Sequence, residues 1–170
     1  MISRPPLDCI LSAYQLPFNG VHGLAHWARV LENGCRLAVA NGANIQVVEL
    51  FAVFHDSRRI NDHVDRGYGW RCGELAQTLR NSHFDLSDND FDLLFMACAK
   101  HTNGLTEGDI TLQVCWDADR LDLYRVGIYP DQRSLCTKTA KEEQVIRWAV
   151  ERSISRQNPS LVEEEWGIWF

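Results

Sequence analysis

Residues 45–56 read IQVVELFAVFHD, a run that is apolar on nearly every face of a helix and ends in a histidine and an aspartate. A helix of this composition is buried almost all round. A buried carboxylate without a partner is costly, so proteins pair it, give it hydrogen bonds or bind it to a metal ion. Other parts of the sequence must therefore supply partners for His55 and Asp56.

The length and composition are those of one soluble globular domain. With 170 residues, 45% of them hydrophobic and 24% charged, the chain can bury roughly 70% of its unfolded surface. Its formal net charge of -6 argues against nucleic-acid binding, which usually requires a basic surface. No uninterrupted apolar run approaches the roughly 20 residues that cross a bilayer, so no membrane partner is expected.

The cysteines are spread along the chain without a C-x-x-C motif, and no charged-then-apolar signal segment opens it. We interpret them as reduced thiols, packed mainly in the core, of a cytoplasmic protein. They are Cys9, Cys35, Cys72, Cys98, Cys115 and Cys136.

Hydrophobic spacing and turn residues predict helices throughout, and strand signals are weak. An Asn41-Gly42 stop ends the first long helix, and a Ser87…Asp90 cap begins another. The expected helices cover residues 22–40, 45–56, 70–81, 87–101, 111–126 and 141–154. We therefore expect residues 1–170 to form a single all-α domain of six or seven helices.

The C-terminal helix and the tail behind it cover residues 138–170 and end in EEEWGIWF. Tryptophans on such a tail either pack on their own domain or form an interface with another copy. We expect the first arrangement, with a homo-oligomer as the alternative.

Elsewhere, polar side chains stand at positions that should be apolar. His26 begins HWARV, with His22 one turn earlier on the same face, and His101 ends an apolar stripe. Asp119 lies on an apolar helix face, whereas Asp117 points about 200° away. Only one of these two aspartates can enter a common site, and Asp119 is the better candidate.

Four nitrogen and oxygen donors share this property and lie on three predicted helices: His26, His55, Asp56 and Asp119. Two imidazoles and two carboxylates without a thiolate suit Mn²⁺, Fe²⁺, Co²⁺, Ni²⁺ or Mg²⁺, whereas structural zinc more often uses cysteine. Water bound to such an ion ionises far more readily than bulk water and becomes a nucleophile near neutral pH. We therefore predict a site for a divalent metal ion.

These residues, with HWARV at 26–30 and DADRLD at 117–122, resemble the H…HD…D signature of the HD-domain superfamily of metal-dependent phosphohydrolases. The resemblance covers roughly residues 20–130 and implies an all-α HD-type domain in which the four donors bind the metal. It also implies hydrolysis of a phosphate ester or phosphoanhydride, of a nucleotide or a related small molecule, by a metal-bound hydroxide. Members of the family include nucleotidases, deoxynucleotide triphosphohydrolases and cyclic-nucleotide phosphodiesterases.

The loop after the pair is similar to a subgroup of small HD proteins with the pattern HDSxRxND, an acidic residue and then HG. The matching residues are Ser57, Arg59, Asn61, Asp62 and Asp65. Tyr68, before Gly69, stands where that subgroup often has histidine. If that histidine serves a second metal, the departure argues against a two-metal site in this chain.

Candidate catalytic residues lie beside Asp56, which is a candidate both as a ligand and as a catalytic group. Arg58 and Arg59 follow it directly, and a guanidinium fork matches phosphate oxygens. The alternative for both arginines is a solvent-exposed position or a salt bridge to a nearby aspartate. His101 is expected to donate a proton to the leaving oxygen or to contact the phosphate.

Two other functions stay open on the sequence. A noncatalytic sensor would keep the metal pocket, bind a nucleotide and report it to a partner. An oxygenase would hold a diiron centre, as some HD relatives do. That chemistry needs additional bridging ligands, and Tyr68 in place of a histidine makes it the weaker alternative.

Overall fold

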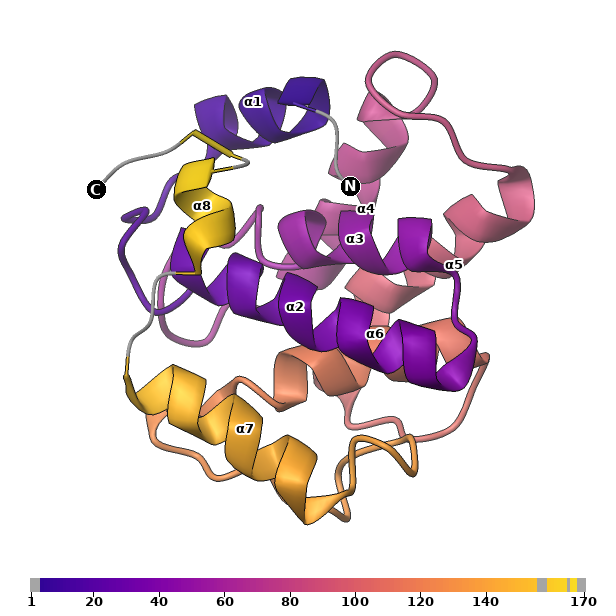
Figure 1. Cartoon of the computed structure of the whole chain (residues 1–170). Coiled ribbons are helices and arrows are strands. Elements are labelled where there is room, and N and C mark those ends of the chain that lie inside the picture. Colours follow the sequence, from indigo (N-terminus) through magenta and orange to yellow (C-terminus); the bar gives the residue numbers. More distant parts are fainter. Residues whose placement is uncertain (1–3, 156–158, 165, 168–170) are drawn as a thin grey trace.

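The structure, a computed structural model, describes residues 4–155, 159–164 and 166–167 (Figure 1). These residues form helices and loops, and no strand occurs among them. The helices are α1 (Arg4–Ala13), α2 (Leu24–Asn41), α3 (Ile45–Phe54), α4 (Tyr68–Leu79), α5 (Asp88–Lys100), α6 (Ile110–Arg120), α7 (Glu143–Ile154) and α8 (Ser160–Glu164), with the short 3₁₀ turns η1 (His101–Asn103) and η2 (Leu123–Val126). The prediction of an all-α fold is confirmed.

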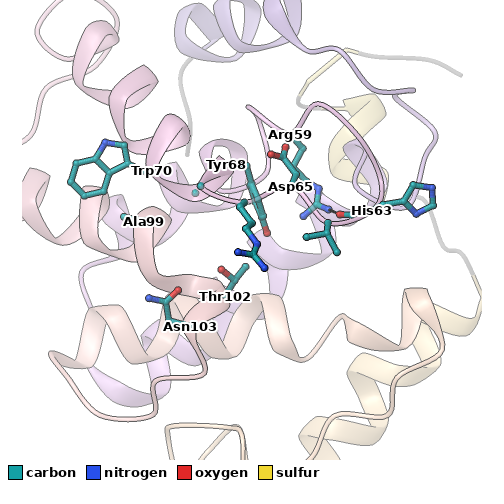
Figure 2. Close-up of a pocket in the computed structure, with 12 residues that line it drawn as sticks. Arg59, His63, Asp65, Tyr68, Trp70, Ala99, Thr102 and Asn103 are labelled. Carbon is teal, nitrogen blue, oxygen red and sulfur yellow. Dashed lines mark hydrogen bonds between the residues drawn. The ribbon is translucent and has the colours of Figure 1, made fainter.

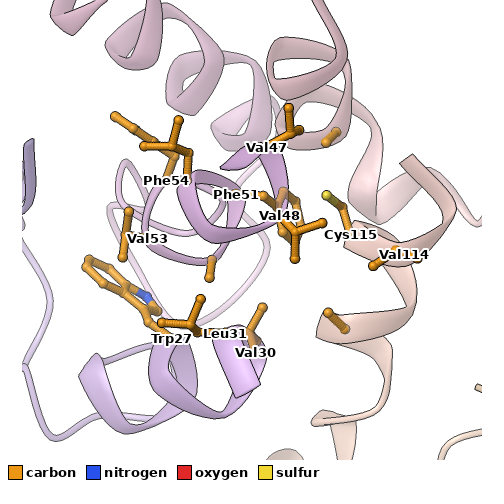
Figure 3. Packing of buried hydrophobic residues seen from close by; sticks show 14 of the residues in the cluster. Trp27, Val30, Leu31, Val47, Val48, Phe51, Val53, Phe54, Val114 and Cys115 are labelled. Carbon is orange, nitrogen blue, oxygen red and sulfur yellow. The ribbon is translucent and has the colours of Figure 1, made fainter. Parts of the chain in front are cut away.

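Helix α3 lies inside the bundle, where it packs against α2, α5 and α6. The side chain of its N-cap, Asn44, accepts hydrogen bonds from the N–H groups of Gln46 and Val47, which fixes where the helix begins. Phe51 and Phe54 are fully buried, and each such side chain stabilises the fold by roughly 1.5–3 kcal/mol. Figure 3 shows side chains of α3 packed between those of α2 and α6. The predicted burial of this helix is confirmed.

Helices α4 and α5 cross closely because α4 carries a glycine at the contact. A Cβ atom on Gly69 would collide with the carbonyl oxygen of Cys98 on α5. A larger residue there would push the helices apart, so the crossing depends on the missing side chain. This crossing brings Tyr68, at the start of α4, against His101, just after α5.

The helix predicted over 22–40 begins at Leu24. Gly23 precedes it in an extended conformation, and a Cβ atom there would collide with the backbone of the preceding loop. Because the chain turns at this glycine, His22 lies in the loop and not on the helical face that carries His26.

The helix predicted over 45–56 ends at Phe54. The N–H of Ser57 donates to the carbonyl oxygen of Phe54, three residues back, and this tighter bond closes a turn. His55 and Asp56 therefore lie in the turn that follows the helix.

The helix predicted over 111–126 is also interrupted, since α6 ends at Arg120 and η2 follows. The N–H of Asp122 donates to the carbonyl oxygen of Asp119 at 2.9 Å. This bond spans three residues and changes the direction in which the later side chains point.

The other predicted helices correspond to α4, α5 and α7, with ends that differ by a few residues. Ser87 caps α5 as predicted, because its hydroxyl oxygen accepts a hydrogen bond from the N–H of Asp90. Helices α1 and α8 lie where no helix was predicted. The first turn of α1 contains two prolines, which a first turn tolerates because its N–H groups have no acceptor within the helix.

The C-terminal tail agrees with the prediction where it is described. Trp166 is 3% exposed and packs into the hydrophobic core, whereas Trp169 and Phe170 lie outside the described residues. No disulfide joins the six cysteines. Within the described ranges, no helix has both the length and the apolar character of a membrane span.

Candidate metal centre

Helix α2 and the turn after α3 bring His26, His55 and Asp56 together. All three are buried, and their nitrogen and oxygen donors lie within 4.8 Å of one another. Asp119, in the last turn of α6, adds a second carboxylate. Its Oδ1 lies 3.5 Å from His26 Nε2 and 3.9 Å from His55 Nε2. The structure therefore places all four predicted ligands around one point.

The shorter separations between these donors are close to the edges of a coordination polyhedron, and two of 3.9 Å are longer. His26 Nε2 lies 3.0 Å from His55 Nε2 and 3.6 Å from Asp56 Oδ2. His55 Nε2 and Asp56 Oδ2 lie 3.9 Å apart. Ligands bound at ~2.1 Å lie ~3.0 Å apart across a right angle and ~3.4 Å apart in a tetrahedron. One divalent ion fits among these donors.

The hydrogen bonds of the two histidines assign their protons. His26 Nδ1 donates to Asp122 Oδ2 at 2.8 Å, and His55 Nδ1 donates to the carbonyl oxygens of Ala52 at 3.0 Å and Phe51 at 3.2 Å. With the proton on Nδ1, each Nε2 presents a lone pair. Two lone pairs 3.0 Å apart repel each other unless a cation lies between them. This arrangement is typical of metal-binding imidazoles.

The carboxylate of Asp119 gives a second indication of a cation. Its Oδ1 is buried and has no hydrogen-bond donor. The nearest cationic group is the Nη2 of Arg125, at 3.7 Å. A buried carboxylate oxygen without a donor is costly, and a metal ion would offset that cost. Asp56 differs, because His22 Nδ1 donates to its Oδ2 at 2.8 Å.

Burial and neighbouring groups shift the pKa values of His26, Asp56 and Asp119 toward the protonation states that bind a metal. Burial, helped by Arg125, lowers the pKa of His26 to about 3 against the opposing effect of Asp122. Burial opposes ionisation of Asp56, but the imidazoles around it, His55 foremost, outweigh burial and hold its pKa well below the ordinary value. Burial likewise opposes ionisation of Asp119, and Arg125 and the imidazoles hold its pKa below the ordinary value. Neutral imidazole and ionised carboxylate are the metal-binding forms.

Asp122 orients His26 through its Nδ1, the ring nitrogen that does not face the other donors. This residue was not identified from the sequence. Its oxygens accept hydrogen bonds from His26 Nδ1 at 2.8 Å, Arg29 Nε at 2.7 Å and the Ser153 hydroxyl at 2.6 Å. Burial opposes its ionisation, but the hydrogen bonds from His26 and Arg29 outweigh burial and lower its pKa. Ser153 belongs to α7, so this helix supports the site. The signal for it in the sequence was the third aspartate of DADRLD.

His101 lies at the edge of the cluster and pairs with Tyr68. Its Nδ1 donates to the carbonyl oxygen of Cys98 at 2.7 Å, so its Nε2 accepts the hydrogen bond of the Tyr68 hydroxyl, also at 2.7 Å. That Nε2 lies 3.9 Å from Asp56 Oδ1. Burial lowers the pKa of His101, so the ring is neutral at pH 7.

The side chains of the neighbouring residues Arg58 and Arg59 point in different directions. Arg59 is buried, with Nη1 4.0 Å from Asp56 Oδ1 and its guanidinium carbon 4.3 Å from the centre of the Tyr68 ring. Arg58 turns away, and its Nη1 donates to the carbonyl oxygen of Ala13 at 3.4 Å. Of the two predicted phosphate-binding arginines, only Arg59 lies at the cluster.

Two further residues of DADRLD point away from the metal donors. Asp117 is fully buried and accepts hydrogen bonds from the N–H groups of Cys136 at 2.6 Å and Thr137 at 2.8 Å. Arg120 donates to the carbonyl oxygen of Ser134 at 2.7 Å. Both residues hold the loop before α7, and Asp119 is the aspartate that faces the imidazoles.

A cavity of about 420 Å³ lies next to the cluster. It shares Arg59 and Tyr68 with the cluster and extends over Trp70, Thr102 and Asn103 (Figure 2). Charged, polar and aromatic groups line it, so it can hold a polar small molecule, but none of the four metal donors is among its lining residues.

No protein-family model matches the chain, and no curated protein or solved structure is significantly similar to it. What the structure itself establishes is an all-helical fold with a buried group of histidine and aspartate side chains that could hold a metal ion.

Proposed function

We propose that the protein is an HD-type metal-dependent phosphohydrolase that acts on a phosphate ester or phosphoanhydride of a nucleotide or related small molecule. The observation that carries this proposal is the pair of imidazole lone pairs, 3.0 Å apart and flanked by two carboxylates. The H…HD…D resemblance supports the same function. When bound, a divalent ion acidifies water into a nucleophile and polarises the phosphoryl oxygen.

The chain's own residues supply positioning and charge. His26, His55, Asp56 and Asp119 would hold the ion. Arg59 lies beside Asp56, where its guanidinium can neutralise the charge that develops on phosphoryl oxygens.

His101 is the candidate for moving the proton. It is neutral, so its Nε2 can take the proton that the attacking water releases and pass it to the leaving oxygen. Tyr68 holds that nitrogen in the resting arrangement and must release it during the step. This assignment makes His101 an acceptor first and a donor second.

The test is hydrolysis by purified protein of an aryl phosphate and a panel of nucleotides and sugar phosphates. We expect activity that requires added Mn²⁺, Co²⁺, Ni²⁺ or Mg²⁺, stops with a chelator and is absent in His55→Ala. The His55→Ala control must remain folded by circular dichroism. Metal-independent hydrolysis, or full activity in His55→Ala, would overturn the proposal.

A sensor is the second candidate, because the donors are almost closed off from solvent. The side chains of His26 and His55 are 0% exposed and that of Asp56 is 2% exposed. A sensor would bind a nucleotide tightly in a metal-dependent way and leave it intact. If calorimetry detects such binding and the whole ester panel survives for hours at every pH, the sensor replaces the hydrolase.

A further inference from the structure

We propose that Arg125 and Arg59 together form an anion-binding pair that selects a doubly charged phosphomonoester group at the metal centre. The inference rests on the proposed function for the presence of a phosphate substrate. It adds Arg125 to the site and narrows the substrate class to monoesters with a terminal phosphate.

Arg125 lies in η2, and its side chain is only 8% exposed. Its Nε donates to the carbonyl oxygen of Val21 at 3.0 Å, and its Nη1 donates to that of Asp122 at 3.2 Å. The remaining nitrogen, Nη2, lies 3.7 Å from Asp119 Oδ1. That separation is too long for a hydrogen bond. The guanidinium is thus held in place by the backbone, with one nitrogen directed at the cluster.

Arg59 repeats this arrangement at the other carboxylate. Its Nη2 donates to the carbonyl oxygen of His63 at 2.9 Å, and its Nε donates to that of Asn61 at 3.4 Å. Its Nη1 lies 4.0 Å from Asp56 Oδ1, again outside hydrogen-bonding distance. Two loops far apart in the sequence therefore each present one preorganised guanidinium to one metal-binding carboxylate.

The contacts form a continuous line through the site. Arg59 meets Asp56, Asp56 meets His26, His26 meets Asp119, and Asp119 meets Arg125, with each separation between 3.5 and 4.0 Å. Arg59 and Arg125 are the first and last residues of this series of contacts. A carboxylate bonded to its arginine would keep that charge for itself, whereas these spacings leave both guanidinium groups free to bind an added anion.

The charges in this line favour a dianion. A histidine that binds an ion through Nε2 and donates from Nδ1 carries no charge, and the hydrogen bonds of His26 and His55 fit this form. The two arginines offset the two carboxylates, so the net charge of the loaded site equals that of the divalent ion. A phosphomonoester carries nearly two negative charges at pH 7, as a phosphorylated side chain does. A phosphodiester carries one, so it would leave the site with an uncompensated charge.

The experiment is calorimetric binding to the Mn²⁺-loaded protein, and it does not depend on turnover. The probes are inorganic phosphate, methyl phosphate and dimethyl phosphate. We expect the wild type to bind the first two at least about tenfold more tightly than dimethyl phosphate. We expect Arg125→Ala and Arg59→Ala each to weaken phosphate binding about 10- to 100-fold, the effect of losing one charged hydrogen bond.

Arg58→Ala and Arg133→Ala are the matched controls, because Arg58 faces away from the cluster and Arg133 is exposed and pairs with Asp131. Both should bind phosphate like the wild type. Elemental analysis must find the same Mn²⁺ content in every variant. Arg125→Lys keeps the charge but not the fork, and should bind phosphate with intermediate affinity.

Equal binding of methyl phosphate and dimethyl phosphate by the wild type would overturn the proposal without any variant. So would wild-type phosphate affinity in Arg125→Ala, which would reduce Arg125 to an anchor for η2. If phosphate binding depends on the arginines but no ester is hydrolysed, the anion-binding pair is supported and the hydrolase proposal is contradicted. If diesters are hydrolysed at the same rate by the wild type and Arg125→Ala, the hydrolase proposal is supported and the anion-binding pair is contradicted.

Discussion

The feature at residue scale that most restricts function is the pair of Nε2 atoms of His26 and His55. Each ring gives its only proton to an acceptor on its other side, so neither nitrogen can donate to the other. Two such lone pairs in a buried place are unfavourable, and a cation removes the repulsion. The same cation would satisfy the buried Oδ1 of Asp119.

Two neighbouring aspartates test this interpretation. Asp119→Asn should remove the metal, because it replaces one of the two carboxylates proposed to bind the ion. Asp117→Asn should keep the metal and lower the free energy of unfolding by about 2–3 kcal/mol, because its carboxylate holds two buried N–H groups. Elemental analysis and urea unfolding measure the two effects. Loss of metal from Asp117→Asn would reverse the assignment of the aspartates.

Asp122 should act on the metal through His26. Asp122→Asn keeps the shape but weakens the acceptor of the His26 Nδ1 proton, and we expect a 10- to 100-fold loss of metal affinity, roughly the range for such supporting residues. Competition with a coloured chelator measures the affinity. Ser153→Ala, which removes one donor to the same carboxylate, should show a smaller loss. Unchanged affinity in both variants would leave Asp122 with a role in stability alone.

At the scale of elements, the loop after α3 is fastened to α4 by Asp65. Its side chain is 4% exposed and accepts hydrogen bonds from Arg71 Nη2 at 2.7 Å and the N–H of Ile60 at 2.9 Å. Burial opposes ionisation, but these bonds outweigh it and lower the pKa of Asp65. This loop carries Arg59, so its anchoring bears on the phosphate binding that we propose for that residue.

The lowered pKa of Asp65 fixes the direction of a pH effect. A carboxylate with a folded-state pKa below its unfolded value contributes stability above the unfolded pKa, ~3.9, and loses it as pH falls through the folded value. Asp65→Asn should lower the free energy of unfolding by roughly 1 kcal/mol at pH 7. The effect is this small because Arg71 is partly exposed, so solvent screens the pair. Urea unfolding should find that this difference shrinks as the pH falls below ~3.9 and disappears below the folded-state pKa.

Asp88→Asn is the matched control for that experiment. Asp88 also pairs with an arginine, Arg80, but its side chain is 94% exposed. An exposed pair of this kind contributes little, so its removal should leave stability unchanged at both pH values. A difference between wild type and Asp65→Asn that persists at acidic pH would mean that the carboxylate charge is not what anchors the loop.

For the whole molecule, a bound metal should stabilise the fold, because its proposed donors come from α2, α6 and the turn after α3. An ion at ~100 times its Kd stabilises the fold by ~2.7 kcal/mol. For a chain of this length that raises Tm by about 5–10 °C. Differential scanning calorimetry with and without Mn²⁺ measures the shift. His55→Ala should show none, and an equal shift in that variant would place the bound ion elsewhere.

The sequence by itself predicted the helical fold and four candidate metal donors. Hydrophobic spacing is a local property, so it predicted a buried α3. A polar residue at an apolar position is also a local signal, because burial of such a residue requires a partner. That signal identified His26, His55, Asp56 and Asp119, which the structure brings together.

Only the tertiary structure decided which neighbouring residues serve the site. The turn after α3 sends Arg58 toward α1 and Arg59 toward Asp56, a difference that adjacent positions in a sequence do not carry. The break after α6 turns Asp122 and Arg125 toward the metal donors. Helix ends are set by tight hydrogen bonds and by packing between distant segments, and both appear only once the chain has folded.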